Sequence, residues 1–298
     1  MSLDISQYVD QAVRAVVREA TYDPSSFEPL RNFNEHWSPS SLSMARRCPE
    51  QFRRRYILGH KERPGSALVI GTAVHKGVER NCGQKIESHI DLPMVDLLDW
   101  YDDEGWPWSV NDEQEKTGQE ILWKDAPDSA RGRGRTMLSA YHHNVAPRIQ
   151  PIGVEGMVEV DFGLAVPVIG RYDILRESTV IDLKTGQRAQ KKPKESWRIQ
   201  AAVYGEAAGR PVEFHSVTMA SDKGAPAIWT PLEAEGLLEQ PTEREREHMR
   251  ISLRAVSAEV CLYMTLFGPE EPWPTHGRFH DWACDWCGFR STCPAWEE

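Results

Sequence analysis

The spacing of apolar positions is typical of helices over most of the chain. Apolar residues recur three or four positions apart, which places them on one face of a helix and predicts burial of that face. The segment 40–58 divides at Cys48-Pro49 into two short helices, because proline is tolerated in the first turn of a new helix. Helices are expected over residues 3–20, 40–58, 68–82, 128–145, 195–208 and 231–266, the last being one helix or a pair.

Between residues 154 and 220 the pattern becomes that of strands. Runs rich in β-branched residues over 154–162, 165–175 and 178–184 predict an antiparallel meander, and 212–220 alternates as a further strand. Helix, three strands, helix and strand in this order predict an α/β fold with a mixed central sheet flanked by helices. Residues 85–145 are expected to form a helical insert. Residues 1–37 are expected to be an N-terminal helix and linker, and 270–298 a cysteine-rich tail.

Composition and charge narrow the class of protein. The 298 residues include 35 Lys and Arg against 45 Asp and Glu, a net charge of −10, with 40% hydrophobic and 27% charged residues. These values are typical of a globular chain rather than a disordered one. No apolar run approaches the roughly 18 residues of a membrane span. The acidic N-terminus lacks an apolar signal segment, so a cytoplasmic location is expected.

Two carboxylates and a lysine are expected to converge on neighbouring strands. A tight turn would set Asp173 beside Asp182, and Lys184 points to the same face of its strand as Asp182. Carboxylate oxygens suit Mg²⁺ or Mn²⁺, and a neighbouring ammonium group can stabilise charge developing on a phosphate. Asp-x-Lys alone is also typical of a surface ion pair, so the neighbouring motifs decide the interpretation.

Ordered motifs resemble the PD-(D/E)xK nucleases of the RecB-like exonuclease group over about residues 38–294, apart from the insert 85–145. They are the pair Asp173 and Asp182-Leu-Lys184, the upstream histidine segment Gly71-Thr-Ala-Val-His75, and the downstream segment Arg198-Ile-Gln200-Ala-Ala-Val-Tyr204. The opening Ser38-Pro-Ser-Ser-Leu and Cys48-Pro-Glu-Gln-Phe also match the start of that group. The resemblance implies a restriction-endonuclease-like fold.

The resemblance also implies roles for the site residues. His75, Asp173 and Asp182 would bind Mg²⁺ or Mn²⁺, and Lys184 would be the catalytic lysine. Gln200 and Tyr204 would position the substrate strand, although four positions apart on a helix they could equally be polar neighbours at the edge of a core. Glu155 and Glu159 precede Asp173, and strand periodicity puts both on one face. Either is therefore a candidate for a further carboxylate ligand.

Four of the six cysteines form a second candidate metal site. Cys284, Cys287 and Cys293 are close in sequence, and Cys48 could supply a fourth thiolate across the fold. Four thiolates suit either zinc or an iron–sulfur cluster. The three-cysteine tail with one distant cysteine resembles the [4Fe–4S] site of the Cas-type and AddB-type RecB-like nucleases, so a cluster is favoured over structural zinc. Such a site would staple the tail to Cys48. Cys82 and Cys261 are expected to be structural.

Basic clusters indicate where nucleic acid would bind despite the acidic net charge. Arg46 to Arg63 contains seven basic residues, and Arg188 to Arg198 contains five. Both flank the proposed site, as a channel for a DNA strand requires, although charge runs are usually solvated faces. The expected contacts within these clusters are Arg53, Arg54, Arg188, Lys191 and Lys192. Arg131, Arg133 and Arg135 form a third cluster.

The expected function is that of a metal-dependent DNA exonuclease acting on single strands or strand ends in recombination or repair. The chain has no phosphate-cradling Gly-x₄-Gly-Lys-[Ser/Thr] loop, so it carries no helicase motor of its own, and a helicase or recombinase is considered as a partner. A catalytically idle DNA-binding module and a redox-sensing iron–sulfur module on the same fold are the alternatives. The complete set of Asp173, Asp182 and Lys184 argues against the idle module.

Overall fold

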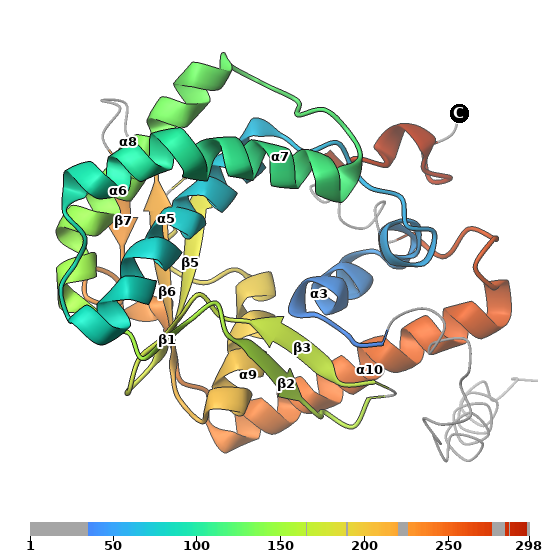
Figure 1. Ribbon diagram of the computed structural model, residues 1–298. Helices are drawn as coiled ribbons and strands as arrows, with labels where there is room; N and C mark the ends of the chain where they lie inside the picture. The colour runs from blue at the N-terminus through green and yellow to red at the C-terminus, as the bar shows by residue number, and fades with distance from the viewer. Residues whose placement is uncertain are drawn as a thin grey trace, which may run out of the picture.

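The structure is a computed structural model that describes residues 35–164, 166–188, 190–219, 226–275, 284–285 and 287–296. Its centre is a mixed sheet with the strand order β1-β4-β5-β6-β7, in which β8 also pairs with β6 (Figure 1). The strands are β1 (Gly153–Val154), β4 (Ile174–Leu175), β5 (Val180–Gly186), β6 (Val212–Thr218), β7 (Ala227–Trp229) and β8 (Leu238–Glu239). Strands β5 and β6 run parallel, so the crossover helix α9 (Glu195–Ala208) joins them.

Helices cover both faces of this sheet, as predicted. The alternation of side chains along β5 sends Ile181 and Leu183 to one face, which α5 (Ser66–Ser88) and α8 (Pro127–Asn144) cover. Val180 points to the other face and packs with residues of α9. The long helix α10 (Glu243–Phe267) lies outside α9 and also contacts α3 (Pro39–Arg47) (Figure 1). The predicted fold class, a mixed sheet between helices, is confirmed.

The predicted three-stranded meander is wrong in one respect. Its strands form two hairpins in different sheets: β2 (Met157–Val160) pairs with β3 (Val168–Arg171) in a separate two-stranded sheet, whereas β4 pairs with β5. The run 154–162 breaks at Glu155, whose φ of 50° is left-handed and ends the extended conformation. The run 165–175 breaks between β3 and β4. Asp173 lies at this second break, where the chain passes from one sheet to the other.

The N-terminal part of the described chain agrees with the predicted pair of short helices. Helix α3 ends at Cys48, and α4 (Pro49–Phe52) begins directly after it and continues into a π-helical turn over Arg53–Ile57. The helix predicted over residues 3–20 lies outside the described residues. The helix predicted over 231–266 is the single helix α10, which begins at Glu243 because Thr242 and Glu245 form a capping box there.

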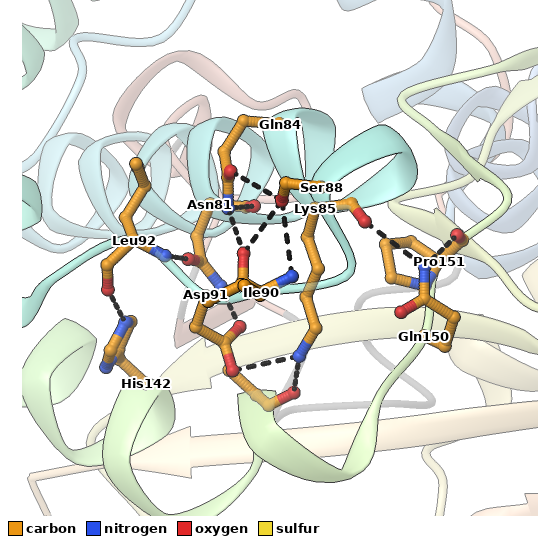
Figure 2. A network of polar contacts seen from close by, with 11 residues as sticks. Asn81, Gln84, Lys85, Ser88, Ile90, Asp91, Leu92, His142, Gln150 and Pro151 are labelled. Carbon is orange, nitrogen blue, oxygen red and sulfur yellow. Dashed lines mark hydrogen bonds and ion pairs between the residues drawn. The ribbon is translucent and has the colours of Figure 1, made fainter.

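The segment 85–145 is helical, and a polar network fastens both of its ends to α5. It contains α6 (Met94–Trp100), a π-helical turn over Tyr101–Gly105, α7 (Trp106–Thr117) and α8. Figure 2 shows Lys85, which donates to Asp91 Oδ2 and to the Ala146 carbonyl, both at 2.8 Å. Asn81 donates to the other oxygen of Asp91 at 2.8 Å. The segment therefore leaves and rejoins the fold at one place, and α7 packs along α5 (Figure 1).

No helix in the described ranges is both long enough and apolar enough to cross a membrane.

Candidate active site

The structure brings Asp173, Asp182 and Lys184 together. Asp182 and Lys184 lie two residues apart on β5, so both side chains leave the strand on the side that α9 covers. Asp173 lies between β3 and β4, and its Oδ2 accepts a hydrogen bond of 2.6 Å from the Leu183 N–H. This bond holds Asp173 against the strand that carries the other two residues.

His75 approaches Asp173 from α5. Its Nδ1 lies 3.1 Å from Asp173 Oδ1. Burial would lower the pKa of His75, but the Asp173 carboxylate outweighs burial and raises that pKa above its ordinary value. Burial would in turn raise the pKa of Asp173, but His75, Lys184 and the Leu183 N–H hold it below its ordinary value. A cation bound at this pair would therefore compete with the imidazole proton.

The Asp182 carboxylate is more deeply buried than that of Asp173 and is incompletely compensated. Its Oδ2 lies 2.5 Å from Lys184 Nζ, yet this oxygen accepts no hydrogen bond of acceptable geometry. Burial, with the neighbouring charge of Asp173, raises the pKa of Asp182 to about 6. A buried carboxylate oxygen without a hydrogen bond is suited to bind a cation, because a positive charge replaces the solvation that the oxygen has lost.

A chain of polar contacts connects Lys184 to α9. Lys184 Nζ donates to Gln200 Oε1 at 2.6 Å, and Gln200 Nε2 lies 3.5 Å from the Tyr204 hydroxyl. Tyr204 can pack here because residue 170 is glycine: a Cβ on Gly170 would lie 2.7 Å from the tyrosine ring. Gln200 and Asp182 hold the ammonium group of Lys184 from two sides and thereby fix its direction.

Glu155 completes a group of possible metal ligands. The sequence alone left open whether Glu155 or Glu159 would be the further carboxylate. One ligand atom each of His75, Glu155 and Asp173 lies within 4.8 Å of the others. Burial and the charge of Asp173 raise the pKa of Glu155, whereas Glu159 is exposed on β2 in the other sheet. Periodicity put both glutamates on one face because it assumed an unbroken strand. Gly156, directly after Glu155, was the available signal of the break.

This set of donors fits a divalent cation. His75, Glu155 and Asp173 offer one imidazole nitrogen and two carboxylates close together, and Asp182 on β5 offers a third carboxylate outside that group. These ligand types suit Mn²⁺ and, for the oxygens, Mg²⁺. Burial first, and then the charge of Asp173, raises the pKa values of Glu155 and Asp182, so a bound cation would stabilise both carboxylates in their charged form.

Comparison with known families agrees with this site. The sequence pattern of the PD-(D/E)XK nuclease superfamily matches residues 36–294. The chain belongs to the PD-(D/E)XK nuclease superfamily. Such nucleases typically use Mg²⁺ or Mn²⁺ on DNA, which agrees with the acidic and histidine ligands of the site.

Similar solved structures are distant from this PD-(D/E)XK nuclease. A candidate exonuclease from Eubacterium rectale is 12% identical, with 82% of this chain and 84% of that chain covered and a TM-score of 0.49. The protein SSO0001 is 14% identical, with 74% and 97% covered and a TM-score of 0.34. No curated protein matches the sequence.

The four predicted cysteine ligands of this PD-(D/E)XK nuclease line one small cavity. Cys48 comes from the junction of α3 and α4, and Cys284, Cys287 and Cys293 come from the tail. Burial and the neighbouring Cys48 and Cys293 raise the pKa of Cys287. Both remaining cysteines, Cys82 and Cys261, are buried in the two hydrophobic cores, where the sequence predicted structural thiols.

Two of the predicted DNA contacts, Arg53 and Arg54, are bound to other parts of the protein instead. Both guanidinium groups bind the carboxylate of Glu50 at 2.7 Å, and the Arg53 side chain is only 5% exposed. Arg53 also donates to the Pro269 carbonyl, and Arg54 donates to the side chain and carbonyl of Thr292. These arginines are engaged in holding the tail, so they are not available to phosphates. The sequence did not single out Glu50, whose carboxylate also accepts a hydrogen bond from the Trp273 N–H at 2.8 Å.

The other predicted contacts are exposed beside the site. Arg188, Lys191 and Lys192 lie in the segment between β5 and α9, and Lys191 Nζ lies 4.2 Å from the centre of the Trp229 ring. A groove of about 480 Å³ begins at Lys184 and passes Arg188. Lys194 and the half-buried Trp197 line the same groove. Trp37, by contrast, is buried and stacks on Phe52, so it is not available to bases.

Proposed function

We propose that this protein is a metal-dependent DNA exonuclease that hydrolyses phosphodiester bonds of single strands or strand ends in recombination or repair. Residues 38–298 form the nuclease domain, with 85–145 as its helical insert. The observation that carries the proposal is the meeting of Asp173, Asp182 and Lys184 at one end of a groove lined by basic residues. An idle module would have no need of an incompletely compensated carboxylate beside an oriented lysine.

His75, Glu155, Asp173 and Asp182 would hold the divalent cation. When bound, Mg²⁺ or Mn²⁺ supplies a Lewis acid for the phosphate and lowers the pKa of bound water. The cation would also add positive charge beside Asp182 Oδ2, which burial leaves only partly compensated by Lys184.

Lys184 would stabilise charge on the phosphate and orient the attacking water. Its ammonium group is already held by Asp182 and Gln200, so it loses little freedom when the substrate binds. Gln200 and Tyr204 act through this lysine and position the strand at the rim of α9. Arg188 and Lys194 line the groove and would bind phosphates there, and Trp197 offers a ring face for a base. Lys191 and Lys192, exposed in the same segment, would bind phosphates beside the groove.

The four cysteines would hold a [4Fe–4S] cluster rather than zinc. The preference for a cluster rests on the spacing in the sequence, three cysteines in the tail and one distant cysteine, and all four side chains line one cavity. In a cytoplasmic protein the thiols stay reduced and available as ligands.

A matched pair of substrates tests the function. Linear single-stranded DNA, labelled at one end, should be shortened progressively with Mn²⁺ and remain intact with a chelator. A covalently closed circle of the same sequence should survive, because the enzyme requires a free end. Lys184→Ala protein, purified in parallel, controls for contaminating nucleases. Cutting of the circle would contradict the exonuclease assignment. An intact linear strand at every metal concentration would favour the idle or redox-sensing module.

A further inference from the structure

A second cavity lies on the opposite side of β5 from Lys184. It has a volume of about 240 Å³ and lies between the end of β5, the start of α5 and α8. Thr185, Gly186 and Gln187 line both this cavity and the groove at Lys184, so the two spaces meet around the end of the strand. Gln187 is three residues from Lys184, which limits the separation of their backbones to roughly 11 Å.

The start of α5 presents unused hydrogen-bond donors to this cavity. The helix has 23 residues, and its N-cap is Gly65, which offers no side chain to the first turn. Ser66 is 4% exposed and lines the cavity, and among the described residues its hydroxyl has no hydrogen-bond partner. The Ala67 N–H likewise has no acceptor within that part of the chain. The Ser66 hydroxyl at the wall of the cavity and the free Ala67 N–H lie at the positive end of a long helix and are suited to an anion.

Arg133 of α8 adds a full positive charge to the same cavity. Its Nη2 lies 2.7 Å from Asp125 Oδ2, and Asp125 also lines the cavity with a side chain that is 50% exposed. A half-exposed carboxylate binds an arginine weakly, because water competes for both groups. An incoming phosphate could therefore take the place of Asp125. The remaining walls include Ile70, Met137 and Met219, which leave room for the apolar part of a nucleotide.

We infer that this cavity is a second phosphate-binding subsite, in which the Ser66 hydroxyl, the Ala67 N–H and Arg133 hold a phosphate of the substrate strand next to the scissile one. The inference rests on the proposed nuclease function and deepens it. The strand would pass from the groove at Lys184 around the end of β5, and Gln187 would lie between the two phosphates. The insert 85–145 thereby contributes a substrate contact through α8.

Equilibrium binding of a fluorescent single-stranded oligonucleotide, with Ca²⁺ in place of the catalytic ion, tests the subsite. Arg133→Gln should weaken binding about tenfold and reduce the slope of log K against log salt by about 0.7, the loss of one phosphate contact. Ser66→Ala should weaken binding about threefold. Arg133→Lys should restore most of the salt slope. Asp125→Asn should tighten binding, since it removes the competing carboxylate.

Arg135→Gln is the matched control, because Arg135 forms a similar ion pair, 2.8 Å from Asp102, on the same helix but outside the cavity. It should bind like the unmodified protein. The Arg133→Gln effect should vanish on an oligonucleotide with an uncharged methylphosphonate at the contacted position. The subsite would be overturned if Arg133→Gln and Arg135→Gln bound the oligonucleotide equally well, or if Asp125→Asn bound it more weakly than the unmodified protein. In either case, cleavage of the strand by the unmodified protein would leave the proposed function intact. Failure of the unmodified protein to bind or cleave DNA would overturn both.

Discussion

The two candidate metal sites of the protein are built in opposite ways. The site around Asp182 is held by regular structure: β5, α5 and α9 each fix one part, and hydrogen bonds connect these elements. The cysteine site joins a helix junction to a tail that is held by the Glu50, Arg53 and Arg54 contacts and by short turns. The first site is therefore a preformed arrangement on regular elements, whereas at the second we expect a bound metal to add to the contacts that hold the tail. Removing a ligand should cost activity in one and stability in the other.

Replacing the catalytic side chains should give the largest effect. Lys184→Ala or Asp182→Asn should lower the single-turnover cleavage rate by about a thousandfold, because each removes charge stabilisation at the phosphate. The melting temperature of Asp182→Asn should be unchanged or higher, because Asp182 is a poorly compensated buried acid. Lys184→Ala should lower it, because the buried carboxylate then loses its ion pair. Thermal unfolding and single-turnover kinetics on one preparation measure both quantities. A large loss of stability in Asp182→Asn would show that the site around Asp182 is not preformed.

Glu50→Gln should destabilise the cysteine end by about 3 to 5 kcal/mol, since it leaves two arginines without their shared carboxylate. Denaturant unfolding measures the change, and limited proteolysis reports whether the tail is released. Glu120→Gln is the control, because the Glu120 side chain is 89% exposed and lies 3.9 Å from its partner Arg63. If Glu50→Gln were as stable as the control, the carboxylate would not be what holds the tail.

Local sequence patterns predicted the elements that bury one face, but not the residues whose role depends on partners distant in the chain. The apolar periodicity was sufficient for α3, α9 and the alternation along β5, because burial on one face repeats every turn or every second residue. Periodicity did not choose Glu155 over Glu159, because it assumes an unbroken strand and gives no weight to Gly156, which marks the break between β1 and β2. Arg53 and Arg54 were misassigned for a similar reason: a run of arginines looks the same whether its partner is a phosphate or a buried glutamate distant in space.

Cys48→Ser should lower the iron content and the melting temperature together, because metal-binding energy is also folding energy. Anaerobically purified protein should be brown, with about four iron atoms per chain if the site holds one [4Fe–4S] cluster. Cys82→Ser is the matched control and should keep the iron, since Cys82 lies on α5 and is buried in the hydrophobic core. If the protein instead contained one zinc ion per chain and showed no visible absorbance, the cluster assignment would be wrong and the site would be a structural zinc site.

The smallest expected effect concerns pH and the strand behind the active site. His215 on β6 contacts the Tyr141 hydroxyl and Glu213, and burial holds the pKa of this histidine below its ordinary value. Below a pH of about 6.5 the histidine is protonated in the unfolded chain but stays neutral in the folded chain. The free energy of unfolding is therefore greatest above this pH and falls as the pH is lowered through it. His215→Gln should flatten this fall by about 1 kcal/mol in denaturant unfolding between pH 7.5 and 5.5. An unchanged pH dependence would show that other groups cause it.

The parallel pairing of β5 and β6 has a consequence for how this enzyme can change its substrate. A parallel pair needs a crossover, so the chain must leave the sheet after Gly186 and return through α9, which carries Gln200. The connecting segment contains Arg188, Lys191 and Lys192 but supplies none of the ligands described for the cation. Mutation can therefore lengthen it or alter its charge while the chemical centre stays fixed. Substrate preference and catalytic power are separately adjustable in this architecture.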